Sequence, residues 1–198
     1  MNILELIEKS HSLAKDKGFW AKEKNPKEDI MLIISNLGEI VKAHKKNKFA
    51  DWLLYNDQMF KDRERTLIHS TEYFNVFIKD TFEDEIANIV IRITDFFGGH
   101  NINILSGKEW LRNSTTVSLV DFFRSTMPLQ KYCGNVGEWL EESLHERFYH
   151  SKESDHGLLN ILFYLGTIIE EFHVDIERQV VAKLEYNSKR PVKYGHII

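Results

Sequence analysis

The chain has 198 residues, of which 42% are hydrophobic and 28% are charged, and its formal net charge is −4. With only ten Gly, three Pro and one Cys, this composition favours long regular elements around one core and argues against disorder, disulfides or a four-sulfur zinc site. The negative balance argues against a nucleic-acid partner. No signal-peptide pattern and no apolar run of about 20 residues is found, which predicts a soluble, cytoplasmic protein with no membrane partner.

Helical patterns follow one another along the chain, and strand patterns are scarce. Apolar residues at helical spacing predict a first helix over residues 3–16. Asn25 and Pro26 predict the start of a second helix, in which Glu28 stands where a capping box needs it and Lys46 is near the end. These signals are typical of a helical protein.

A third helix is predicted to begin after Thr81 or Asp80 and to end at Gly98 and Gly99. Further helical patterns occupy residues 65–78, 116–126, 131–150, 156–172 and 175–188. The predicted fold class is therefore all-α, a helical bundle formed by a single domain over residues 1–198.

One face of the third predicted helix is polar, whereas the opposite face is rich in Ile and Phe. The polar residues are Glu85, Asn88, Arg92 and Asp95. Asn36 and Glu39, one turn apart on the second helix, can supply a polar partner. Two such helices offer oxygen ligands suited to a hard cation such as Mg²⁺. A solvated polar stripe is the other interpretation.

Three stretches of the sequence resemble, in the same order, the MazG-like nucleoside triphosphate pyrophosphohydrolases of the all-α NTP pyrophosphatase superfamily. They are GFWAKEKNPKEDIMLIISNLGEIVKAHKKNKFAD (18–51), TFEDEIANIVIRITDFFGG (81–99) and KLEYNSKRPVKYG (183–195). The resemblance implies a MazG-like α-helical bundle that splits a nucleoside triphosphate into a monophosphate and pyrophosphate. It also implies Mg²⁺ or Mn²⁺ as the cofactor and a homo-oligomer, here expected to be a dimer.

The family's metal signature is a Glu-x-x-Glu pair on one helix and a Glu-x-x-Asp pair on the next. The matching pairs in this sequence are Asn36 with Glu39 and Glu85 with Asn88. Each pair keeps one carboxylate and carries an amide in place of the other. The resemblance implies that Glu39 and Glu85 are the catalytic residues and that Asn36 and Asn88 help them to hold the metal.

The two amides leave alternatives open. An amide oxygen can coordinate a cation, but two fewer negative charges weaken the attraction for Mg²⁺ and for a metal-activated water. The site would then bind metal only together with a triphosphate, borrow Asp84 or Asp95, or bind no metal. The leading hypothesis is a Mg²⁺-dependent pyrophosphohydrolase. The alternative is a catalytically inactive MazG-like module that binds a nucleotide or mediates oligomerisation.

The C-terminal stretch supplies candidate contacts for the nucleotide. Lys183 and Asn187 share a helix face, and Arg190 follows at the end of that helix. A lysine point charge, an amide donor and an arginine fork suit a phosphate chain. The resemblance implies this role, with Tyr194 nearby and Trp20 against the base. Basic residues that complement a helix dipole, and a core Trp, are the other interpretation.

Part of the C-terminal half looks like a second, degenerate copy of the N-terminal half. The stretch NVGE (135–138) repeats NLGE (36–39), and residues 160–176 align without a gap on residues 88–104. Gly157 stands where the first copy has a metal-holding Glu, so the second copy could not rebuild the metal site unaided. A pseudo-twofold bundle is predicted, and chance alignment of amphipathic helices is the alternative. The repeat-like halves are about residues 1–104 and 131–198.

Overall fold

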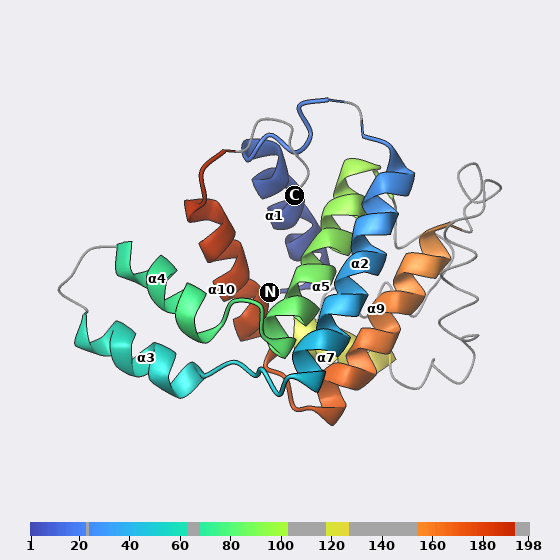
Figure 1. The fold of residues 1–198 in the computed structure, drawn as a ribbon. Helices are drawn as coiled ribbons and strands as arrows, with labels where there is room; N and C mark the ends of the chain where they lie inside the picture. The colour runs from blue at the N-terminus through green and yellow to red at the C-terminus, as the bar shows by residue number, and fades with distance from the viewer. Residues whose placement is uncertain (23, 63–67, 103–117, 127–153, 193–198) are drawn as a thin grey trace.

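The computed structural model describes residues 1–22, 24–62, 68–102, 118–126 and 154–192. These residues form eight helices and no strand, which confirms the predicted all-α class. In chain order the helices are α1 (Ile3–Asp16), α2 (Pro26–Lys45), α3 (Trp52–Lys61), α4 (Ile68–Phe77), α5 (Phe82–Gly99), α7 (Leu119–Thr126), α9 (Ser154–Glu171) and α10 (Ile176–Lys189) (Figure 1). None of these helices is long and apolar enough to cross a membrane.

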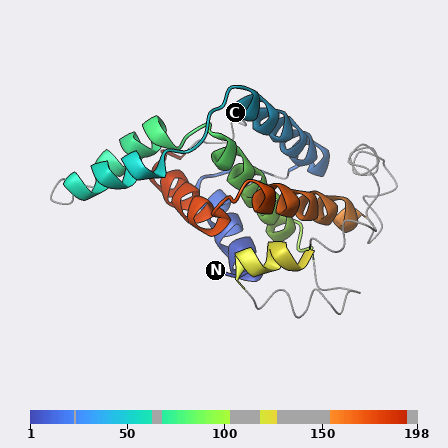
Figure 2. The same cartoon turned by 90° about the horizontal axis from the view of Figure 1, so that it is seen from below.

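The central helix of the bundle is α5, which packs against α1, α2, α9 and α10 (Figures 1 and 2). It begins after Thr81, as predicted, because the Thr81 hydroxyl accepts a hydrogen bond from the Asp84 N–H at 3.3 Å. Twelve of its eighteen residues are buried. A helix enclosed in this way has no solvated side, so its polar residues must face other elements of the protein.

The helix caps follow the sequence with one exception. Asn25 caps α2 as predicted, because its Oδ1 accepts a hydrogen bond from the Lys27 N–H at 3.0 Å. The capping box predicted with Glu28 is not formed, since the Asn25 side chain bonds the N–H one residue earlier. A reciprocal capping box is found instead at α1, between Asn2 and Glu5.

The predicted end of this helix is confirmed, since α5 ends at Gly99. Neither Gly98 nor Gly99 has the left-handed backbone of a glycine cap, which is found instead at Asn101, at φ 53°. A Cβ on Gly98 would lie 2.6 Å from the Cβ of His11, and a Cβ on Gly99 would lie 1.9 Å from Cη2 of Trp20. The glycines therefore allow close packing against this end of α5.

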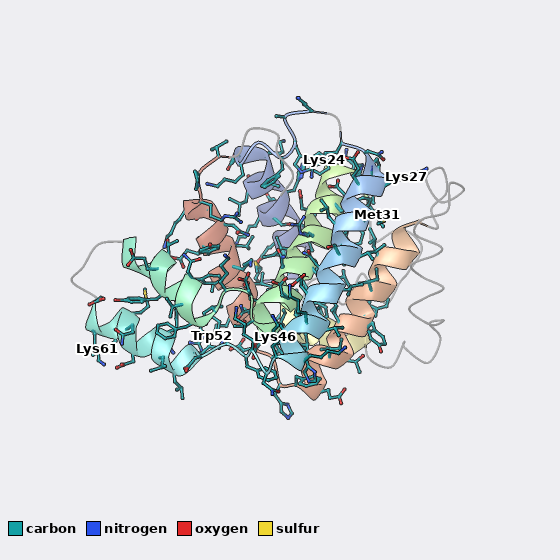
Figure 3. The ribbon with its side chains drawn as sticks, in the orientation of Figure 1. Lys24, Lys27, Met31, Lys46, Trp52 and Lys61 are labelled. Carbon is teal, nitrogen blue, oxygen red and sulfur yellow. The ribbon has the colours of Figure 1, made fainter. Side chains whose placement is uncertain are left out.

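The helices α3 and α4 lie side by side and project from the bundle, and we call them the arm (Figures 1 and 2). The predicted helix near residues 65–78 is α4, whereas α3 was not predicted. Trp52 and Lys61 mark the two ends of α3, which buries none of its residues (Figure 3). Both helices of the arm contact α10: Phe74 of α4 stacks on Tyr186 at 4.4 Å, and Asn56 of α3 accepts a hydrogen bond from Arg178 at 2.8 Å.

The predicted repeat has one structural counterpart. When residues 160–176 are aligned in sequence on residues 88–104, the first and last residues of α9 align with the first and last residues of α5. Both helices have 18 residues. Each is followed by a residue with a left-handed backbone, but so is α2, which makes this ending a common helix cap and no mark of a repeat. The NVGE stretch and the predicted helix 131–150 lie outside the described residues, so the duplication stays a prediction.

Candidate functional site

A cavity of about 280 Å³ lies along α5, with α1, α2 and α10 forming its other walls. The whole predicted polar face of α5 lines it, namely Glu85, Asn88, Arg92 and Asp95. The opposite wall carries the predicted nucleotide contacts of the C-terminal stretch, namely Lys183, Asn187 and Arg190. Two sets of residues far apart in the sequence therefore meet in one cavity.

Lys183 is held by a buried acid at the beginning of α5. Its Nζ donates a hydrogen bond to Oδ2 of Asp84 at 2.7 Å, and the two residues are 7% and 0% exposed. The same Oδ2 accepts a hydrogen bond from the Asp80 N–H at 3.0 Å. Because a buried charge is costly without a partner, this ion pair fixes α10 against α5. An ammonium has three donors, so Lys183 keeps capacity for a phosphate oxygen.

Three of the four predicted metal-holding residues form a hydrogen-bonded chain with Arg92. With the Asn36 amide oriented to suit its neighbours, its oxygen accepts hydrogen bonds from Nε of Arg92 at 2.9 Å and from Nδ2 of Asn88 at 2.8 Å. Nδ2 of Asn88 also donates to Oε2 of Glu85, at 3.4 Å. The Asn36 oxygen that would have to coordinate a cation is therefore occupied by two donors, one of them positively charged.

Glu39, the fourth predicted metal-holding residue, points elsewhere. Its Oε2 accepts a hydrogen bond from Nζ of Lys42 at 2.8 Å, on the same helix, and its side chain is 46% exposed. Glu39 is not among the residues that line the cavity. Of the two acids predicted to be catalytic, only Glu85 reaches the cavity.

The predicted set of metal ligands does not fit a cation as it is arranged, because a guanidinium stands against the Asn36 oxygen and Glu39 is turned away. Among the described residues a different group of acids brings one oxygen each to within 4.8 Å of the others. Its members are Asp80, Asp84 and Glu85. Lysines already face this group: Nζ of Lys79 lies 3.8 Å and Nζ of Lys48 lies 4.0 Å from an oxygen of Asp80.

Burial changes the acidity of the charged groups that line the cavity. It raises the pKa of the Glu85 carboxyl, and the nearby carboxylate of Asp84 adds to this effect. Burial also lowers the pKa of the Arg92 guanidinium and raises that of the Asp95 carboxyl. A carboxyl with a raised pKa can exchange a proton nearer to neutral pH, which makes Glu85 and Asp95 the lining acids suited to acid–base chemistry. Of the two, Asp95 is bonded by His11 and Trp20.

Trp20 lies behind the cavity wall. Its Nε1 donates a hydrogen bond to Oδ1 of Asp95 at 2.9 Å, and Nδ1 of His11 lies 3.0 Å from the same oxygen. Nζ of Lys24, at the end of the bundle opposite Lys46 (Figure 3), lies 4.3 Å from the centre of the Trp20 ring. Trp20 itself is not a lining residue, so it positions Asp95 here. Tyr194 lies outside the described residues.

Several lining residues were missed by the sequence analysis. Asp29 lies seven residues before Asn36, two turns away on the same face of α2, so the helical period could have found it. Lys17 and Lys24 lie outside the helices, where no period applies, and nothing in the sequence distinguishes them from other lysines.

No protein-family model, no curated protein and no solved structure matches this chain. The likeness to MazG-like proteins therefore depends on the sequence stretches quoted above.

Proposed function

We propose that this chain binds a nucleoside triphosphate in the cavity, with the phosphate chain against α10. The observation that carries this proposal is the charge of the lining. Six basic residues line the cavity against four acidic ones, although the whole chain has a net charge of −4. Asp84, behind the wall, balances Lys183, and the remaining bases still outnumber the acids. Such a lining attracts a ligand with several negative charges.

The composition of the lining favours a nucleotide over a bare phosphate chain. The cavity also has apolar lining residues, which are Leu13, Ala14, Phe19, Leu32, Ile33, Ile91 and Phe96. A pocket that joins apolar surface to a few convergent polar groups is typical of a small-molecule site. A base and sugar would occupy the apolar part, while Lys183, Asn187 and Arg190 would contact the phosphates.

Binding can be tested by titrating the purified chain with a panel of nucleoside and deoxynucleoside triphosphates. Arg190→Gln should weaken binding roughly 10-fold or more, because a charge-assisted contact to phosphate is worth about 1.5–3 kcal/mol. Lys45→Gln is the matched control, since Lys45 is exposed at the end of α2 and does not line the cavity. If no triphosphate binds, or if both variants bind as the wild type does, the proposal fails.

Pyrophosphohydrolysis is the second candidate function, favoured by Glu85. This buried carboxyl with a raised pKa stands in the cavity and could take a proton from an attacking water. Incubation with triphosphates and Mg²⁺ or Mn²⁺ should then yield monophosphate and pyrophosphate, and Glu85→Gln should abolish the products. If products are absent while Glu85→Gln still binds nucleotide, the chain is a binding module. A gain of activity in the double variant Asn36→Glu, Asn88→Asp would show that the two missing carboxylates limit catalysis.

We also propose that the chain forms a homodimer through the arm. Leu53 is 84% exposed on α3, and Val76 is 70% exposed on α4, so the described residues leave apolar surface of the arm uncovered. Light scattering on the purified protein should give the mass of a dimer. Leu53→Glu should shift it to that of a monomer, whereas Lys61→Glu at the far end of α3 should not.

A further inference from the structure

We infer that Arg92, held by Asn36, contacts the phosphate chain directly, so that the cavity binds its anionic ligand without a divalent cation. The inference rests on the proposed function only for the nucleoside part of the ligand. The anion contact itself is inferred from the position of the Arg92 guanidinium in the cavity wall and from its bond to a neutral amide.

Arg92 is a partly buried cation that has no acidic partner among the residues that the structure describes. No ion pair joins it to a carboxylate of the described chain within 4.0 Å. With the Asn36 amide in the orientation that suits its neighbours, Nε of Arg92 donates to the neutral oxygen of Asn36. A guanidinium has five N–H donors, and charged groups are rarely withdrawn from water unless they are paired or bind a ligand. Since Arg92 lines the cavity, the missing partner is expected in the cavity.

Three carboxylates attract Arg92 through space, namely Asp29, Asp95 and Glu85, and each has another donor. Asp29 accepts a hydrogen bond from Lys24 at 3.2 Å, Asp95 is bonded by His11 and Trp20 at 3.0 and 2.9 Å, and Glu85 accepts one from Asn88 at 3.4 Å. Each of these acids therefore has its own counter-charge or donors. They attract Arg92 through space, and among the described residues only Asn36 accepts a hydrogen bond from its guanidinium, at Nε.

Asn36 orients Arg92 without neutralising it. A Glu at this position, which the resemblance leads one to expect, could either bind a cation or pair with Arg92, and in the second case it would cancel the positive charge. An amide oxygen accepts the Nε–H equally well and leaves the whole charge available to a ligand. The exchange of Glu for Asn thus converts a position suited to a cation into one suited to an anion.

Arg190 supports the same conclusion from the opposite wall. It lines the cavity at the end of α10 and lies close enough to Arg92 for the two charges to repel each other. Two guanidinium groups that face one cavity are stabilised together by an anion placed between them. Arginine forks bind phosphate oxygens in pairs, which makes a polyphosphate the fitting ligand class.

The test is a titration with inorganic tripolyphosphate and with a non-hydrolysable nucleoside triphosphate, each in EDTA and in excess Mg²⁺. The wild type should bind both ligands in EDTA, and Mg²⁺ should change neither affinity more than about threefold beyond its own binding to the free ligand. Arg92→Gln should weaken both affinities roughly 10- to 100-fold. Asn36→Glu should weaken them in EDTA as well, because its carboxylate would pair with Arg92.

Arg178→Gln is the matched control, because it removes one arginine of α10 that lies outside the cavity and is bonded to Asn56. Melting curves verify that each variant is folded. Tripolyphosphate binding that depends on Arg92, without binding of the nucleotide, would support this inference and reject the proposed function. Nucleotide binding that requires Mg²⁺, or that survives Arg92→Gln unchanged, would support the proposed function and overturn this inference. Binding of neither ligand would reject both.

Discussion

Two cationic side chains that line the same cavity have different partners: one is paired with a carboxylate and the other with a neutral amide. Lys183, on α10, is paired at 2.7 Å with Asp84, which is wholly buried at the beginning of α5. Arg92, two turns further along α5 than Glu85, is bonded to the neutral amide of Asn36. Among the described residues Lys183 has an acidic partner, whereas Arg92 has none within 4.0 Å. The comparison separates a charge that fixes α10 against α5 from one that, in our proposal, is balanced by a ligand.

The largest expected effect concerns the paired cation. Lys183→Met should lower the free energy of unfolding by about 3–5 kcal/mol, because it leaves the Asp84 carboxylate buried and unpaired. Lys189→Met, which breaks a surface pair with Glu185 and one hydrogen bond to Ser70, should cost about 1–2 kcal/mol in the same urea titration. Equal losses in the two variants would mean that the pair with Asp84 has no special weight.

A smaller effect is expected at the far end of α5, where packing is governed by shape instead of charge. Gly99→Ala should cost about 1–3 kcal/mol, because its Cβ would meet the Trp20 ring at 1.9 Å and the ring is held by Asp95. Gly38→Ala is the matched control in α2, where no atom lies within 4 Å of the added Cβ. It should stabilise the protein by about 0.5–1 kcal/mol. Calorimetry that finds the same sign for both would refute this reading of Gly99.

The smallest expected effect is a pH-dependent change in stability at Glu85, the acid that shares the cavity with the two cations. Because the pKa of Glu85 is raised in the folded protein, the folded state holds this proton more tightly than the unfolded state does. The protonated Glu85 carboxyl therefore stabilises the folded state at any pH below its pKa in the unfolded chain. This stabilisation is lost as the pH rises through the pKa of Glu85 in the folded protein. Glu85→Gln should therefore melt above the wild type at pH 8, and the gap should shrink towards pH 4. A gap that does not change with pH would contradict the burial effect.

The sequence was sufficient for the features that depend on helical period and local caps. The polar face of α5 was predicted because Glu85, Asn88, Arg92 and Asp95 recur every three or four residues, and all four line the cavity. The caps at Asn25 and Thr81 followed from residue type alone. Local chemistry decides such features before any tertiary contact forms.

Features that depend on packing between distant segments escaped the sequence analysis. Glu39 has the same spacing from Asn36 as Asn88 has from Glu85, yet Lys42 on its own helix draws it away from the cavity. The helix α3 buries nothing in the bundle, so it leaves no strong apolar period to detect. Lys183 lies 99 residues from its partner Asp84, and Arg92 lies 56 residues from its partner Asn36. No pattern along the chain reveals such contacts.

The most direct measurement is a crystal structure of the protein soaked with a non-hydrolysable nucleoside triphosphate, in EDTA and again in Mg²⁺. The account predicts phosphate oxygens within hydrogen-bond distance of the Arg92 guanidinium, with Lys183 and Arg190 alongside, in both crystals. A nucleotide bound away from this cavity, or phosphates reached only through a cation on Glu85 and Asn88, would contradict it.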